Sequence, residues 1–494
     1  MLGWIKNLFA TPLSSSVEKD LQRSAVSGAA QTTQDEAGAV CKHDGDAHLD
    51  NGDWLHAADS YRRALSSNPA LAEAHSNLGF ALMKLGSFAE AKSHLQCALS
   101  IKPHLFNAFY ILGLVSHYSG DLAGAISSID QANTIKPDFQ DGFIALGNAL
   151  CAAKRFDEAL ASYDHALALD PHDPTANWGK SLVALASGDF IQGWQLYEWR
   201  WLEFAKSMAR QYRQPKWLGE ASVAGKTILI YPEQGFGDVI QFCRYAPLVE
   251  KLGARVIFEA PQQILGLLST LEGDIRIVEL GKPLPEFDLH CPVMSLPLAF
   301  KTSMETIPAS VPYLFSAPDK RAAWNERLGQ KRQLRVGLVW SGGFRGDQPE
   351  TWSVNARRNI ALSSFASLNL PGIEFFSLQK GEEAQAQLRQ LEGAFWNGPA
   401  IADYTAEFHD FSDTAAFIDN LDIIISVDTA IAHLAGAMGK EVWILNRFDN
   451  CWRWMADRSD SPWYPTATLF RQKSMGDWDS VMLDVKRRLG SEQK

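Results

Sequence analysis

The sequence predicts two different halves: an N-terminal superhelix of paired helices, followed by an α/β region built from two lobes. In the first half, small residues recur every 34 positions, as at Gly45 and Gly79. From Lys226 onward, short runs rich in β-branched residues alternate with helical segments, which is typical of parallel sheets. We therefore expect a disordered leader, a helical array, and a first and a second α/β lobe over residues 1–35, 36–205, 206–333 and 334–494.

Several columns of residues define the repeat. Glycines and alanines at fixed positions let two antiparallel helices approach closely, and a proline ends the second helix because it has no N–H and crowds the preceding turn. A column of larger apolar residues fills the space between the helices. The columns are Gly45, Gly79, Gly113 and Gly147; Ala57, Ala91, Ala125 and Ala159; Ala64, Ala98, Ala132 and Ala166; Pro69, Pro103, Pro137 and Pro171; and Tyr61, Leu95, Ile129 and Tyr163.

This pattern resembles the tetratricopeptide repeat over four full units, and a degenerate fifth unit continues through Gly188 and Gly193. The resemblance implies a superhelix whose concave face binds a protein or peptide. Some members of the family line that face with asparagines, but here only Asn77 fits, because Ile111 and Ala145 take the equivalent positions. The alternative is an array that serves only as a spacer or dimer scaffold.

Composition excludes several classes of function. A net charge of −11 argues against a partner bound through its phosphate backbone, so we expect no nucleic acid. The six cysteines form no CxxC or CxxH pair, which predicts no metal, no disulfide framework and a reducing, cytoplasmic location. No window offers about 18 uncharged apolar residues, so we expect no stable membrane insertion. The leader is either frayed or contains a short interfacial helix through Trp4 and Phe9.

Residues 193–206 join the two halves and carry Trp194, Trp199 and Trp201. Aromatic rings can stack on the apolar faces of sugars, but such a cluster is more often packing between domains. We favour the packing interpretation.

The second half contains runs that predict buried strands, each followed by a turn and usually by a helix: KTILIY, RVIFEA, RVGLVW, IEFFSL, DIIISV and EVWILN. Right-handed crossovers then give parallel sheets, and the break around 308–334 is expected to connect two Rossmann-like lobes that face a cleft. Function in such folds lies at the carboxyl ends of the strands.

Two segments stand at such ends. In EQGFGDVIQ, Gly237 permits close backbone approach, and Asp238 at a helix N-terminus is expected to stay ionised and to act either as a general base or only as a capping residue. In SVDTAIAHLA, Asp428 and Thr429 are expected to cap a helix whose free N–H groups seat a diphosphate. His433 would donate a hydrogen bond to a phosphate oxygen or be a satisfied structural histidine.

Together these segments resemble the bacterial heptosyltransferase type of GT-B glycosyltransferase, over about residues 225–490. The resemblance implies that Asp238 is the general base for the acceptor hydroxyl and that residues 428–433 hold the sugar and diphosphate of the donor. Ala430 replaces the usual glycine. A lysine expected in the turn after the second lobe's first strand, near Ser341, is not obvious. Arg357 or Arg358, or Lys380 at lower priority, is the candidate for that positive charge.

The sequence therefore predicts an inverting, metal-independent glycosyltransferase with a nucleoside-diphosphate sugar as co-substrate and no cofactor. The tandem of repeat arm and GT-B half is similar in architecture to protein O-GlcNAc transferases, so a polypeptide acceptor is expected. Two alternatives remain: an adaptor that has lost catalysis, and a sugar-nucleotide epimerase. The Trp- and Arg-rich segment 449–472 is expected to be a loop that either closes over a substrate or pins the last helix.

Overall fold

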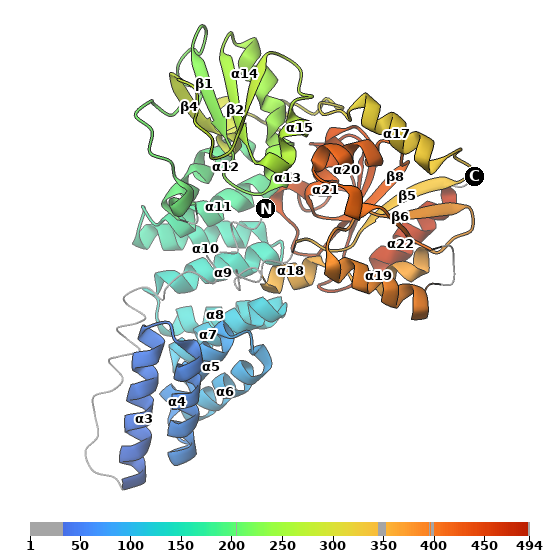
Figure 1. The fold of residues 1–494 in the computed structure, drawn as a ribbon. Coiled ribbons are helices and arrows are strands. Elements are labelled where there is room, and N and C mark those ends of the chain that lie inside the picture. Colours follow the sequence, from blue (N-terminus) through green and yellow to red (C-terminus); the bar gives the residue numbers. More distant parts are fainter. Residues whose placement is uncertain (1–32, 204, 344–351, 395, 397–399, 493–494) are drawn as a thin grey trace. The chain divides into compact units, whose positions relative to one another are not determined.

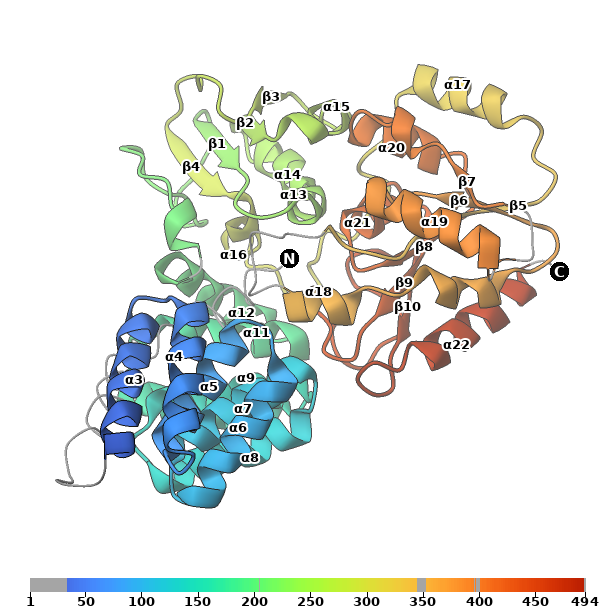
Figure 2. The same ribbon diagram turned by 60° about the horizontal axis from the view of Figure 1, so that its bottom comes forward.

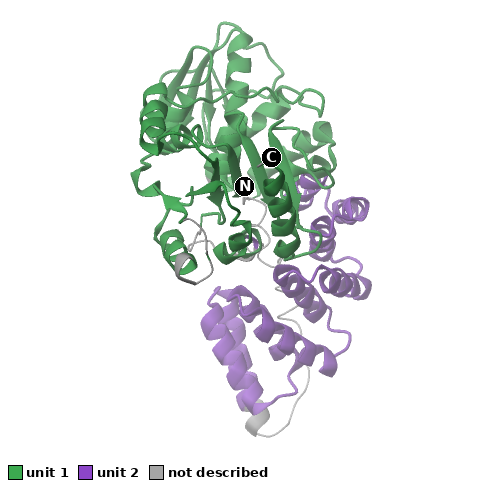
Figure 3. Ribbon diagram, turned by 90° about the vertical axis from the view of Figure 1, so that its right-hand side faces the viewer, with its two compact units in different colours: residues 1, 184–344, 355–494 green, residues 2–183, 345–354 purple. Residues whose placement is uncertain are grey.

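The computed structural model describes residues 33–203, 205–343, 352–394, 396 and 400–492 (Figure 1). Contacts divide these residues into two compact units (Figure 3). The helical unit runs to Val183 and includes residues 352–354, and the α/β unit holds the remaining residues from Ala184 onward. Of the predicted leader, residues 1–32 lie outside the described residues, and 33–35 belong to the first described helix.

The helical unit consists of successive antiparallel helices (Figure 2). They are α3 (Thr33–Asp50), α4 (Trp54–Ser67), α5 (Ala72–Lys84), α6 (Phe88–Ile101), α7 (Phe106–Ser119), α8 (Leu122–Ile135), α9 (Gln140–Ala152) and α10 (Phe156–Leu169). Each column proline follows the second helix of a pair by two residues, as Pro103 follows α6. The fifth pair, α11 (Pro174–Ser187) and α12 (Phe190–Tyr197), begins in this unit and ends in the α/β unit.

The glycine column faces the large apolar column inside each pair. A Cβ added to Gly45, Gly79, Gly113 or Gly147 would lie 2.7, 2.6, 2.3 or 2.8 Å from the side chain of Tyr61, Leu95, Ile129 or Tyr163, respectively. These four large side chains are essentially inaccessible to solvent. Because real Cβ atoms do not come this close to another atom, only glycine lets each large residue fill the space between its two helices.

The α/β unit contains two sheets in which every strand pair is parallel, as the sequence predicted. The four-stranded sheet has the order β3-β2-β1-β4, and the six-stranded sheet has the order β10-β9-β8-β5-β6-β7. In the larger sheet, Val336 of β5 lies opposite Ile423 of β8 on one side and Phe375 of β6 on the other. The strands are β1 (Thr227–Tyr231), β2 (Arg255–Ala260), β3 (Ile275–Glu279), β4 (Leu289–Pro292), β5 (Leu334–Val339), β6 (Ile373–Ser377), β7 (Ala402–Asp403), β8 (Ile423–Val427), β9 (Glu441–Asn446) and β10 (Ala467–Arg471).

Helices connect these strands, and α17 lies within the predicted connector 308–334. They are α13 (Phe236–Phe242), α14 (Ala246–Lys251), α15 (Leu265–Leu268), α16 (Leu296–Ala299), α17 (Pro318–Leu328), α18 (Trp352–Arg358), α19 (Glu382–Ala394), α20 (Phe411–Ile418), α21 (Ala430–Ala437) and α22 (Trp478–Ser491). Helix α13, which carries Asp238, packs against α21, which begins directly after Thr429. Among the described residues, no helix is both long and apolar enough to cross a bilayer.

The tryptophan-rich joint packs into the α/β unit. The Trp194 ring is buried and contacts the rings of Phe242, Trp452 and Trp463. Arg200, also fully buried, donates two hydrogen bonds to the carboxylate of Glu233, from Nε at 2.7 Å and from Nη2 at 2.9 Å. These contacts favour the packing interpretation of the joint over a sugar-stacking role.

Candidate functional site

A cavity of about 310 Å³ lies at the carboxyl ends of β5 and β6 and at the start of α21. Its size is that of a small-molecule site. Parallel sheets place their binding sites at this edge because the loops that follow the strands converge there. The lining residues are Gln263, Val339, Ser341, Gly343, Leu378, Gln379, Lys380, Phe408, His409, Asp410, Phe411, Thr414, Thr429, Ala430 and Ile431.

Four of the predicted substrate-binding residues meet in this cavity: Ser341, Lys380, Thr429 and Ala430. They come from three separate segments of the chain. The Ser341 backbone N–H donates to the side-chain oxygen of Gln379 at 2.9 Å, which ties the turn after β5 to the turn after β6. The Lys380 ammonium donates to the carbonyl of Phe408, so its charge is held at the cavity wall.

The start of α21 gives the cavity a partial positive charge. Thr429 is the N-cap residue, with extended backbone angles, but its side chain does not bond to the first-turn N–H groups. Its hydroxyl instead lies 3.1 Å from the hydroxyl of Ser426. The prediction that Asp428 and Thr429 cap this helix holds only for the position of Thr429, because Asp428 precedes the N-cap and the Thr429 side chain makes no capping bond. First-turn N–H groups that are not capped by a side chain suit a phosphate.

Asp238 is fully buried and forms an ion pair with Arg453. The Nη2 atom of Arg453 lies 2.5 Å from Oδ1 of Asp238, and the Nε atom donates to the side-chain oxygen of Gln241 at 2.8 Å. Burial opposes the charged form of the Asp238 carboxyl, but nearby positive charges, that of the Arg453 guanidinium among them, favour it, and the pKa of this carboxyl lies below its usual range. The carboxylate is ionised, as the sequence predicted.

Asp238 is not the N-cap residue of α13 but the third residue of this helix. Gly235 is the N-cap of α13, and the Oδ2 atom of Asp238 accepts a hydrogen bond from its N–H at 2.9 Å. Gly237 is buried in the same first turn. Asp238 and Gly237 are absent from the described lining of the cavity. The structure thus separates the predicted base from the cavity and covers it with Arg453.

His433 is fully buried on the first turn of α21. Its Nδ1 atom lies 2.9 Å from the hydroxyl of Tyr464, and its ring stacks on Trp454 with centroids 5.2 Å apart. Burial lowers the pKa of His433 well below its ordinary value, so the imidazole is neutral at pH 7. Burial also raises the pKa of Tyr464 to about 12, so this hydroxyl keeps its proton and can donate to Nδ1.

This arrangement assigns the imidazole proton to Nε2. Within the described part of the chain that atom has no hydrogen-bond partner, and it lies 4.0 Å from Oδ1 of Asp428. Burial raises the pKa of Asp428. Tyr464 and Trp454 hold the His433 ring in place, as expected of a structural histidine. Its Nε2–H has no partner among the described residues, as the functional interpretation requires.

The two candidate arginines are not an exposed basic pair. Arg357 donates to Oδ2 of Asp449 at 3.0 Å, and Arg358 is buried with Nη2 2.7 Å from the side-chain oxygen of Asn355. Arg358 also donates to the backbone carbonyl of Asp428 at 3.3 Å. Neither arginine is part of the described cavity lining, whereas Lys380 is. Sequence reasoning ranked Lys380 below the two arginines, yet Lys380 is the one of the three that lines the described cavity.

The segment 449–472 is not simply a loop, which corrects the prediction. It contains β10, an edge strand of the larger sheet, and Trp452, Trp454 and Trp463 are buried. Sequence reasoning missed Arg453 as a partner of Asp238. The only signal was an arginine flanked by tryptophans, and nothing in that pattern names an aspartate 215 residues away.

Comparisons with known proteins agree with the helical repeat. Models of the tetratricopeptide repeat match residues 45–86, 72–105 and 140–173. The prediction of tetratricopeptide repeats is confirmed by these matches.

One curated relative is Protein FlbA of Caulobacter vibrioides, which is 27% identical over 335 residues. The match covers 62% of this chain and 53% of the relative, so the chain spans about half the length of that protein. Solved structures similar to this chain include MamA (22% identical, TM-score 0.30, 34% of this chain and 97% of that one) and pilF of Pseudomonas aeruginosa (19%, 0.32, 36% and 80%). Likenesses at these scores do not support an inference about function.

Proposed function

We propose that this protein is an inverting, metal-independent glycosyltransferase of the GT-B type that moves a sugar from a nucleoside diphosphate to a hydroxyl group of a polypeptide. The observation that carries the proposal is the cavity at the ends of β5 and β6. Ser341, Lys380 and the adjacent pair Thr429 and Ala430 come from three segments far apart in the sequence, are substrate-binding candidates on sequence grounds alone, and line one cavity of ligand size.

In the proposed mechanism the donor diphosphate lies at the start of α21. The helix dipole and the Lys380 ammonium stabilise the negative charge that develops on the departing nucleoside diphosphate. His433 is buried and is not part of the described cavity lining, so its proposed donation from Nε2–H to a phosphate oxygen requires the start of α21 to open when the donor binds. Because the imidazole is neutral, it donates a hydrogen bond without adding a charge.

Asp238 is the proposed general base, and it takes a proton from the acceptor hydroxyl as that oxygen attacks the sugar. In the present arrangement its Oδ1 is held by Arg453. The mechanism therefore requires the ion pair to loosen when acceptor binds. Arg453 would then be a positioning residue that keeps Asp238 ionised between turnovers.

The polypeptide acceptor rests on the tetratricopeptide repeats, a fold that commonly binds proteins and peptides. The proposed sugar-nucleotide donor is supported by the cavity in the α/β unit. A catalytically inactive adaptor is the second candidate, and the complete burial of Asp238 beneath Arg453 favours it.

Donor binding is tested first, with a thermal-shift screen of nucleoside-diphosphate sugars against the full chain. A true donor raises the melting temperature because it binds only the folded state. The Lys380→Met variant should lose most of this shift, and Lys282→Met, at an exposed lysine outside the cavity, should keep it. No shift with any nucleotide in the wild type would remove the basis of the proposal.

Transfer is tested by intact-mass measurement of candidate partner proteins co-expressed with the wild type or with Asp238→Asn. A sugar-sized mass increase that needs the wild-type carboxylate supports the enzyme. Donor binding by both proteins without any mass increase on any acceptor supports the adaptor instead.

A further inference from the structure

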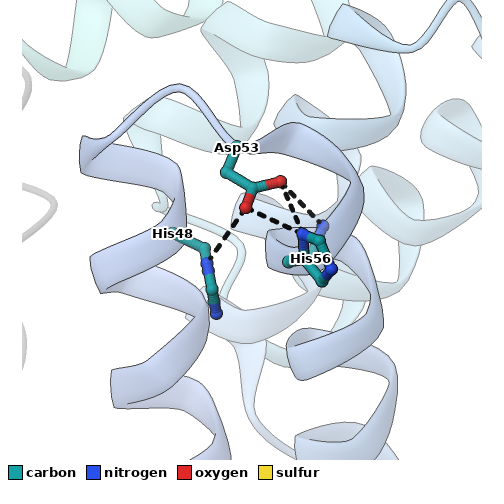
Figure 4. Close-up of side chains that lie close together, drawn as sticks. All are labelled: His48, Asp53 and His56. Carbon is teal, nitrogen blue, oxygen red and sulfur yellow. Dashed lines mark hydrogen bonds and ion pairs between the residues drawn. The ribbon is translucent and has the colours of Figure 1, made fainter.

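Three side chains converge at the turn between α3 and α4, in the first helix pair (Figure 4). His48 lies in the last turn of α3, Asp53 is the N-cap of α4, and His56 lies in the first turn of α4. Each offers a ligand atom, and these atoms all lie within 4.8 Å of one another. The group lies entirely within the helical unit.

The Asp53 carboxylate lies between the two imidazoles. Its Oδ2 atom is 2.8 Å from Nδ1 of His56 and 3.4 Å from Nδ1 of His48. The two rings are stacked, with centroids 5.4 Å apart. Figure 4 shows both rings directed toward the carboxylate from different helices.

The backbone fixes these positions before any ligand binds. Gly52 has a φ of +72°, which makes the tight turn, and the Asp53 N–H donates to the carbonyl of His48 at 2.9 Å. Oδ1 of Asp53 accepts the backbone N–H of His56 at 3.3 Å as a helix cap. The side chains themselves stay accessible, with His48 and His56 exposed by 41% and 65%.

We propose that His48, Asp53 and His56 bind a divalent transition-metal cation, with Zn²⁺ the best match. Two imidazole nitrogens and one carboxylate oxygen are ligands that zinc prefers, and water would complete the coordination. Calcium and magnesium fit poorly, because they require mostly oxygen ligands. A zinc–nitrogen distance of about 2.0–2.1 Å places tetrahedral ligands about 3.4 Å apart. The ligand atoms lie within 4.8 Å of one another, so binding would require the exposed rings to turn, which shortens the longest separation and lengthens the 2.8 Å one between Asp53 and His56.

The surrounding charges allow a cation. Arg62 and Arg63 line the same pocket, but Arg62 is paired with Asp59 at 3.2 Å and with Glu90 at 2.9 Å, and Arg63 donates to the Ser60 hydroxyl at 3.0 Å. The bound ion would link the end of α3 to the start of α4. Since the ligands come together only in the folded hairpin, metal binding stabilises the first helix pair of the array.

The proposed zinc site contradicts the expectation of no metal, which did not consider histidine and aspartate ligands. That prediction rested on the spacing of the cysteines, whereas the three ligands here follow an H-x₄-D-x₂-H spacing that crosses a helix–turn–helix. The proposal is independent of sugar transfer in the α/β unit.

The test is a zinc titration of the full chain, free of any affinity tag, in competition with a chromophoric chelator. We expect one equivalent to bind, and His48→Gln and His56→Gln each to weaken it at least roughly tenfold. His104→Gln, which removes an exposed histidine in the loop after α6, should bind as the wild type does. Equal affinity in the wild type and in both ligand variants would overturn the proposal.

Two further variants separate metal binding from other effects. Asp53→Asn keeps a good capping residue but removes the anionic ligand, so it should fold, as judged by circular dichroism, and bind zinc more weakly. His75 and His94 form another imidazole pair, with their Nδ1 atoms 2.9 Å apart. If His94→Gln abolishes zinc binding and His48→Gln does not, the ion belongs to that pair and the proposal is wrong.

Discussion

Asp238 is a residue whose role depends on a side chain far away in the sequence. Its ion pair with Arg453 is almost completely shielded from water, with both side chains no more than 2% exposed. Taking two charges out of water is costly, and their attraction offsets this cost only while both are present. The pair therefore favours the ionised form of the proposed base and joins the segment after β9 to α13.

Replacement of Arg453 by Met is expected to destabilise the α/β unit by about 3–5 kcal/mol, because it removes the guanidinium that forms an ion pair with the buried Asp238 carboxylate. Urea denaturation followed by circular dichroism measures this change. The matched control is Arg458→Met, which removes an exposed pair with Asp460 and should cost less than about 1 kcal/mol. The double variant Asp238→Asn/Arg453→Met should recover part of the loss. Additive effects of the two single changes would contradict the coupling.

His433 gives the protein a defined pH dependence. Burial lowers its pKa in the folded state, and the unfolded chain takes up a proton near pH 6.5. The unfolded state thus binds more protons below this pH, and stability falls as the pH is lowered from about 7 to 5. Among the described residues, the guanidinium groups of Arg453 and Arg244 oppose protonation of the ring and Asp238 favours it, while Oδ1 of Asp428 lies 4.0 Å from Nε2.

The His433→Phe variant keeps a ring on Trp454 and removes the titration. Its melting temperature should therefore fall less between pH 7 and pH 5 than that of the wild type. Wild type and variant are to be compared by scanning calorimetry across this range. Identical pH profiles would show that His433 titrates normally.

At the scale of the element, the helix pairs are set by the contact between glycine and a large residue. A glycine-to-alanine change inside a helix ordinarily stabilises it by roughly 1 kcal/mol. At Gly113 the new Cβ would lie 2.3 Å from Cγ1 of Ile129, so Gly113→Ala should instead destabilise the helical unit by about 1–3 kcal/mol.

Circular dichroism melting of Gly113→Ala, of Gly113→Ala/Ile129→Ala and of Gly490→Ala tests this expectation. Because loss of the buried Ile129 side chain is itself costly, Ile129→Ala is measured as well, and the double variant should be less destabilised than the sum of the two single changes. Gly490 is a helical glycine at which an added methyl would meet, among the described residues, only Cδ1 of Leu370, at 3.9 Å, so its replacement should stabilise α22 slightly. A stabilised Gly113→Ala variant would show that the two helices can move apart freely.

The sequence was sufficient to predict these elements because their determinants are local and periodic. The Gly113 and Ile129 columns, and buried strands such as β5 and β8, each express one repeated physical constraint. Strand β10 was missed because its residues lie in a stretch rich in Trp, Arg and Asp, and the strands β3, β4 and β7 were not among the predicted runs either. The Asp238–Arg453 pair and the clustering of Ser341 with Thr429 depend on tertiary contacts between distant segments, and periodicity does not encode such contacts.

At the scale of the whole molecule, each unit carries one proposed small ligand, a sugar nucleotide in the α/β unit and a zinc ion in the helical unit. A nucleoside-diphosphate sugar at 100 times its Kd would stabilise the folded state by about 2.7 kcal/mol. Hydrogen exchange should then slow around β5, β6 and α21, and exchange in α3 and α4 should stay unchanged. Zinc should produce the opposite pattern. Protection of α3 and α4 by the nucleotide would contradict the assignment of separate sites.

The contact between glycine and a large residue also bears on how this array changes over evolutionary time. Because Gly79 meets Leu95, and Gly113 meets Ile129, within one helix pair, each 34-residue unit brings its own complementary surfaces. Duplication or loss of a whole unit in the gene therefore preserves these contacts, and the array can lengthen or shorten in steps of one helix pair. Its length is a heritable variable that selection can adjust while the α/β unit keeps its own sequence.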